Sequence, residues 1–127
     1  PMAAALNKCH RLIKTEKLKD RNIVPAIFIL SDCGANISVK HPDLIAQVET
    51  DYSLIVKELE EITKKLMKQE INLVVLEPKK SYATQALGVH PYSANQIKEN
   101  FQKFGGKVYQ FDKYSSKDLI LKLKKIL

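Results

Sequence analysis

The chain has 127 residues, of which 45% are hydrophobic and 28% charged, the size and balance of one folded domain. This composition excludes wholesale disorder, and no apolar run reaches the roughly 20 residues that a membrane-spanning helix needs. The two cysteines, Cys9 and Cys33, are too few for a disulfide framework and lack the spacing of zinc ligands. We therefore expect a globular chain with the length of one domain and not two, cytoplasmic and without a membrane partner.

The net charge of +7 comes from 21 basic and 14 acidic residues, and it permits binding to polyanions. However, nearly all the bases are lysines, and they are scattered over predicted helix surfaces. A nucleic-acid interface more often combines clustered Arg and Lys with exposed aromatic side chains. The pattern favours a solvated lysine surface, and nucleic acid is not an expected partner.

The first half of the chain alternates helical and extended patterns. An apolar stripe from Met2 to Ile13 predicts a first helix, which ends in the polar run 17–22. Residues 23–30 are almost all apolar and predict a strand buried on both faces. A loop over 33–50 follows, with a short helix at 43–48. Residues 51–70 carry the strongest helical pattern of the chain.

The second half repeats this alternation. Residues 71–76 predict a second buried strand, and a polar loop follows over 79–92. A capping box at 93–96 predicts the start of a helix, and a glycine pair at 105–106 predicts its end. A short strand at 108–111 precedes a last helix that starts at Ser115, with Asp118 three residues later.

The resulting order, α-β-α-β-α-β-α, predicts an α/β fold: a Rossmann-like three-layer sandwich with a parallel sheet in spatial order one-two-three. The strand over 23–30 is apolar enough to be central, yet nothing before it supplies a second neighbour. We therefore expect part of a larger domain. The exposed edge of this strand should be covered by a second copy of the chain or by a separate polypeptide that carries the absent strands.

Most motifs that carry chemistry are missing. The sequence has no phosphate-binding glycine loop, no nucleophile elbow and no cluster with metal-ligand spacing. His10, His41 and His90 are interpreted as surface residues, and Cys33 as a buried or bystander thiol without an activating base. We therefore assign no catalytic and no cofactor-binding residue.

One feature remains, Ser31-Asp32 at the carboxyl end of the first strand. In open α/β sheets, ligands bind outside the carboxyl ends of the strands, where the strand order reverses. Asp32 could there hold a hard cation such as Mg²⁺, which takes oxygen ligands. Alternatively, Asp32 caps the loop that follows it. The sequence pattern leaves both interpretations open.

The stretches 1–6, 24–32, 34–37 and 104–109 together resemble the von Willebrand factor A domain, most closely that of the magnesium and cobalt chelatase D-type subunits. In that family a Thr-Pro step begins the helix, a strand ending in Asp leads into a Gly-Arg-Ala-Asn loop, and a glycine pair precedes the last strand. The resemblance covers essentially the whole chain, but only the carboxy-terminal half of the family's domain.

The resemblance implies a partial metal-ion-dependent adhesion site. In the family, three loops supply an Asp-x-Ser-x-Ser motif, a threonine and an aspartate. Only the aspartate has a counterpart here, Asp32, and Cys33-Gly34 replaces the family's Gly-Arg. Mg²⁺ is thus implied for the complete domain, and this chain alone is not expected to hold it well.

The implied function is docking within an ATP-driven chelatase that inserts a metal into a tetrapyrrole, with this segment non-catalytic within the ligase complex. Its partners would be chelatase-type ATPase subunits or the missing amino-terminal half. Two alternatives remain. One is a stand-alone von Willebrand A-type interaction module. The other is a receiver-like domain with Asp32 as phospho-acceptor and Lys79 or Lys80 as its cation.

Overall fold

The computed structural model describes residues 2–31, 33–35, 37–43, 45–46, 49–78, 91–111 and 116–126. Helices and strands alternate along this part of the chain, as the sequence predicts. The elements are α1 (Met2–Lys19), β1 (Ala26–Leu30), α2 (Glu49–Lys68), β2 (Asn72–Pro78), α4 (Pro91–Lys103), β3 (Lys107–Phe111) and α5 (Ser116–Ile126).

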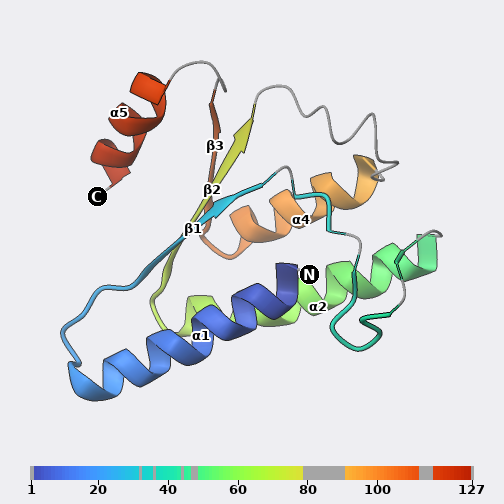
Figure 1. Ribbon diagram of the computed structural model, residues 1–127, viewed down its shortest axis with the longest axis horizontal. Helices are drawn as coiled ribbons and strands as arrows, with labels where there is room; N and C mark the ends of the chain where they lie inside the picture. The colour runs from blue at the N-terminus through green and yellow to red at the C-terminus, as the bar shows by residue number, and fades with distance from the viewer. Residues whose placement is uncertain are drawn as a thin grey trace.

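The described strands form a parallel sheet in the order β1-β2-β3. Ile27 of β1 lies beside Leu73 of β2, and Val75 of β2 lies beside Val108 of β3. Helices α1, α2 and α4 lie on one side of the sheet and α5 lies on the other (Figure 1). The predicted α/β class, the parallel pairing and the strand order are therefore confirmed.

The core lies between the sheet and the three helices on its one side. The inner stripe of α2, predicted from its apolar spacing, is almost completely buried, and β2 and α4 add further buried side chains. These core residues are Ile55, Leu59, Ile62 and Leu66 of α2, Leu73 and Val75 of β2, and Ile97 and Phe101 of α4. Because β2 is the central strand, its side chains are buried on both faces of the sheet.

The first strand differs from its prediction in length and in burial. It begins at Ala26 and not at Ile23, and it lies at an edge of the described sheet. Its face toward the helices carries buried Ile27, whereas on the other face Ala26 is exposed and Leu30 is 65% exposed. The prediction of burial on both faces is wrong because α1, α2 and α4 lie on the side of Ile27, whereas Ala26 and Leu30 point to the opposite side and remain exposed.

The end of α4 confirms the predicted role of the glycine pair. Gly105 has a φ of +89°, a left-handed conformation that favours glycine. Its N–H donates to the Gln102 carbonyl at 3.0 Å, and the Gly106 N–H donates to the Phe101 carbonyl at 2.7 Å. These two bonds form a Schellman motif, which ends the helix and directs the chain into β3.

Two local predictions are wrong. The short helix expected at 43–48 is absent from its described residues: Ile45 instead forms an isolated antiparallel bridge with Ile37. Helix α4 begins at Pro91 and not at the predicted cap Ser93, because proline suits a first helical position, where no N–H partner is needed. The predicted loop over 79–92 is wrong at 91–92, which belong to α4, and its remainder and the predicted cap Ser115 lie outside the described residues.

Candidate functional site

The carboxyl end of β1 continues into a turn that hydrogen bonds fix. The Ser31 N–H donates to the Leu76 carbonyl at 3.2 Å, which extends the β1–β2 pairing by one residue. The Ser31 hydroxyl accepts the Cys33 N–H at 3.0 Å. Cys33 is fully buried and has a φ of +62°, which is uncommon for a residue with a side chain. The chain therefore turns sharply here, at the end of the sheet where α/β proteins bind ligands.

A buried carboxylate on α2 holds the next part of this loop. Glu58 accepts the Ser38 hydroxyl at 2.7 Å, the Val39 N–H at 2.9 Å and the Lys40 N–H at 3.3 Å. The Ser38 hydroxyl in turn accepts the N–H groups of Lys40 and His41. We call residues 38–41 together with Glu58 the loop anchor. It fixes the loop against the helix although the segment has little regular structure.

The electrostatics of the loop anchor favour the charged form of Glu58. Burial alone would raise the pKa of this carboxyl group. The hydrogen bonds from Ser38, Val39 and Lys40, together with the Lys40 charge, outweigh burial and hold the pKa below its ordinary value. Glu58 therefore acts as an ionised structural anchor at neutral pH.

A second polar cluster lies at the carboxyl end of β2. Glu77 is largely buried and its Oε1 lies 2.8 Å from Lys98 Nζ on α4. The side chains of Glu77 and Lys98 are only 11% and 21% exposed. Gln110 of β3 lies beside Glu77 in the strand register. The ion pair links α4 to the end of the sheet, and because these groups are shielded from water, removal of either partner would leave an uncompensated charge.

This cluster borders a groove of about 340 Å³ between α4 and β3. Polar side chains from one stripe of α4 line one wall, and Val108 and Gln110 line the other. The groove can offer hydrogen-bond donors and acceptors to a polar ligand. The sequence interpretation missed Glu77 and Lys98, since their separation by 21 positions hides the pairing; a charged residue at the end of a buried strand was the available signal.

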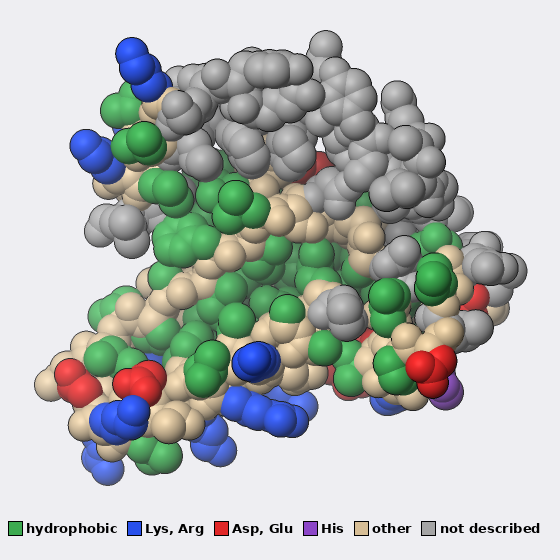
Figure 2. Space-filling model, viewed as in Figure 1, with side chains coloured by type: hydrophobic (Ala, Val, Ile, Leu, Met, Phe, Trp, Pro, Cys, Tyr) green, Lys and Arg blue, Asp and Glu red, His purple; other side chains and the backbone are tan. Residues whose placement is uncertain are grey.

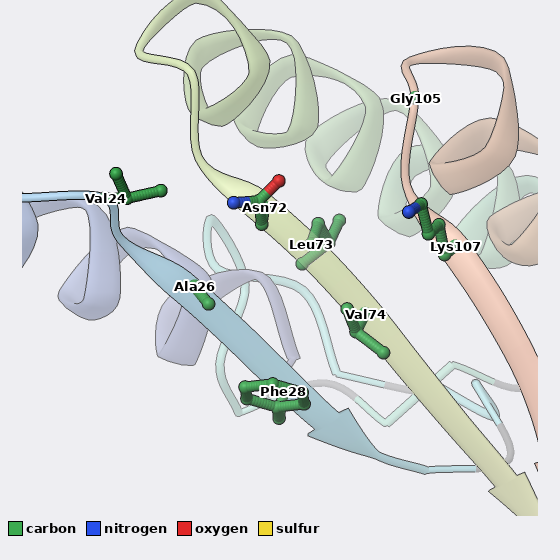
Figure 3. A pocket seen from close by; sticks show the side chains of 8 residues that line it. All are labelled: Val24, Ala26, Phe28, Asn72, Leu73, Val74, Gly105 and Lys107. Atoms are coloured by element: carbon green, nitrogen blue, oxygen red, sulfur yellow. The ribbon is translucent and has the colours of Figure 1, made fainter. Parts of the chain in front are cut away.

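The other face of the sheet has a hollow of about 250 Å³, lined by apolar side chains together with Asn72 and Lys107. Figure 3 shows Val24 just before β1 and Ala26 and Phe28 on β1, with Asn72 and Val74 of β2 beside them. Hydrophobic side chains gather over this part of the sheet, between α1 and α5 (Figure 2). This face is therefore less well covered by helices than the opposite one.

Some of the candidate residues predicted from the sequence lie in the described structure and others lie outside it. Asp32, the candidate metal ligand, lies outside the described residues, as do His90, Lys79 and Lys80. His10 lies on α1, half-buried, and His41 is exposed in the loop, far apart in sequence and in separate elements. Within the ranges that the structure describes, no three His, Cys, Asp or Glu side chains form a group able to hold a metal ion. Metal binding at Asp32 thus stays a prediction.

The described helices include none that is long and apolar enough to cross a membrane. The arrangement defines the class of protein only as an α/β layered fold with a parallel sheet.

No family model matches the chain, and no solved structure matches it. The chain is similar to the uncharacterized protein MJ0910 of Methanocaldococcus jannaschii, with 29% identity over 128 residues. The match covers 100% of this chain and 61% of that protein. The chain therefore spans about three fifths of the length of the relative that it matches.

Proposed function

We propose that this chain is a protein-docking unit that corresponds to the carboxy-terminal half of a von Willebrand factor A domain in a chelatase-type complex. The complex would use ATP to insert a metal into a tetrapyrrole, and this segment would contribute binding and not catalysis. The proposal gives it two kinds of partner: ATPase subunits of the complex, or a polypeptide that supplies the other half of the domain.

The observation that carries the proposal is the turn at Ser31 and Cys33, held at the carboxyl end of β1. This is the position in the chain at which the resemblance puts the aspartate loop of the family's adhesion site. The parallel order β1-β2-β3 supports the same interpretation. The loop anchor adds a physical basis for docking, because a loop already fixed by Glu58 loses little conformational entropy when a partner binds.

The described residues do not by themselves fit a Mg²⁺ site, since they contain no group of three suitable ligands. A metal would need Asp32 and oxygen ligands from another polypeptide. We therefore assign docking to the protein surface around the turn and the loop anchor, and no step to a metal.

Binding of the purified chain to chelatase-type ATPase subunits from the same organism tests the proposal. We expect saturable binding by biolayer interferometry that Asp32→Ala weakens by about tenfold, the equivalent of one good charged contact. Asp43→Ala is the matched control, because Asp43 is an exposed acidic residue of the same loop region. Absence of binding, or equal losses in both variants, would contradict the proposed docking site.

A further inference from the structure

The outer edge of β1 presents backbone groups that no described residue pairs. The N–H of Ser31 bonds to Leu76 and the carbonyl of Pro25 bonds to Asn72. Backbone groups alternate in direction along a strand, so odd-numbered residues from 25 to 31 face β2. The N–H and C=O groups of Ala26, Phe28 and Leu30 therefore face outward. Among the described strands, β2 is the one that pairs with β1.

The residues of this edge carry no charged side chain that would oppose pairing with another strand. Residues 22–31 contain no charged side chain, in a chain that carries 35 charged residues among 127. Natural sheets protect exposed edges with lysines, and the edge strand β3 has an exposed one, Lys107. The edge of β1 has no such protection. An identical edge can approach it without bringing like charges together.

We propose that β1 pairs with β1 of a second copy of this chain, antiparallel, about a two-fold axis at Phe28. With this register Phe28 lies opposite its counterpart, and Ala26 lies opposite Leu30 of the other copy. All three outward residues then form hydrogen-bonded pairs, with about six N–H···O bonds in total. When pairing is confined to Ala26–Leu30, any other register leaves some of these groups unpaired.

The side chains fit the same arrangement. Ala26, Phe28 and Leu30 share one face of the strand, by the period of two along a strand, and Ala26 and Phe28 line the hollow on that face. Leu30, 65% exposed in one chain, would lie beside the small Ala26 of the other copy, next to that hollow. The pairing joins two three-stranded sheets into one of six strands, a common size for a sheet. A polypeptide that supplied the other half of the domain would occupy the same edge, so its binding and this pairing exclude each other, whereas docking of ATPase subunits does not use this edge.

Charged substitutions at Ala26 and Leu30, the positions that would lie opposite each other in the dimer, test the inference. Size-exclusion chromatography with light scattering should give twice the 14.4 kDa chain mass for the unaltered protein. The double variant Ala26→Lys with Leu30→Lys puts like charges opposite each other twice, and we expect dimerisation to weaken by tenfold or more. The variant Ala26→Glu with Leu30→Lys puts opposite charges there and should remain dimeric.

Both variants change side chains that are exposed in one chain, so each should keep the circular dichroism spectrum of the fold. Hydrogen exchange gives an independent measurement, in which the amides of Ala26, Phe28 and Leu30 should be protected in the dimer. A chain that stays monomeric at high concentration overturns the inference. So does a dimer that the paired lysines leave intact, or one in which these three amides exchange freely.

Discussion

Replacing Glu58 by glutamine tests the loop anchor most directly. The carboxylate accepts three hydrogen bonds, from Ser38 at 2.7 Å, Val39 at 2.9 Å and Lys40 at 3.3 Å. Glutamine has nearly the same shape but keeps only one acceptor oxygen. Its NH₂ group would therefore replace one acceptor oxygen and face either a backbone N–H or the Ser38 hydroxyl. That donor would lose its acceptor at a largely buried position, since Glu58 is only 8% exposed.

The expected loss follows from these contacts. A hydrogen bond to a charged group contributes about 1.5–3 kcal/mol, and glutamine should preserve part of the set. We therefore expect Glu58→Gln to lower the free energy of unfolding by about 2–3 kcal/mol. Urea denaturation followed by circular dichroism measures this loss. Hydrogen exchange should also show faster exchange of the Val39 and Lys40 amides.

The same anchor predicts a dependence on pH. The pKa of Glu58 in the folded chain lies below its ordinary value of 4.5. A carboxyl group with a lowered pKa contributes stability that is fully present above the unfolded pKa and is lost as the pH falls through the folded pKa. The difference in stability between the unaltered protein and Glu58→Gln should therefore be constant at neutral pH and shrink below about pH 4.5.

The control is Glu61→Gln, because Glu61 is an exposed acidic residue of the same helix. This variant should change the stability by less than about 0.5 kcal/mol. A Glu58→Gln protein as stable as this control, with unchanged exchange at Val39 and Lys40, would refute the reasoning about the anchor.

Three further measurements test other parts of the structure. Lys98→Met leaves the largely buried Glu77 carboxylate unpaired and should cost about 1–3 kcal/mol in urea denaturation, most of it recovered when Glu77→Gln is added. Gly106→Ala would put a Cβ 2.7 Å from the Phe101 carbonyl oxygen, so thermal unfolding should show a loss of about 1–3 kcal/mol; an unchanged midpoint would refute this close approach. Isothermal titration with Mg²⁺ should detect no tight site on the chain alone, and six-fold coordination at Asp32 by this chain would disprove that expectation.

Much of the fold follows from local patterns in the sequence. The stripe of Ile55, Leu59, Ile62 and Leu66 predicts α2 because only a helical period puts all four on one face. The Gly105-Gly106 pair predicts the end of α4, because a left-handed position after a helix favours glycine. The parallel order of the strands follows from their alternation with helices.

Other features depend on contacts between distant residues. The loop anchor joins positions 20 apart, and the pair of Glu77 with Lys98 joins positions 21 apart. Neither pairing leaves a periodic signal, because the partners lie on different elements. The position of Asp32 at a strand end and the family resemblance are enough to make it a candidate residue. The roles of Glu58 and Glu77 follow only from their contacts with Ser38 and Lys98 in the folded chain.

The sequence by itself determined the α/β class, the strand order and the polar turn after the first strand, because these depend on local periodicity and chain direction. Only the tertiary structure decided which faces of the strands are buried and which strand edges are paired. An apolar strand such as β1 is predicted to be buried from its composition alone, because that composition is the same whether the strand lies at the centre or at the edge of a sheet. The elements packed around the strand set its exposure: three helices lie on the side of buried Ile27, the opposite side leaves Ala26 and Leu30 exposed, and β2 is its one neighbour among the described strands.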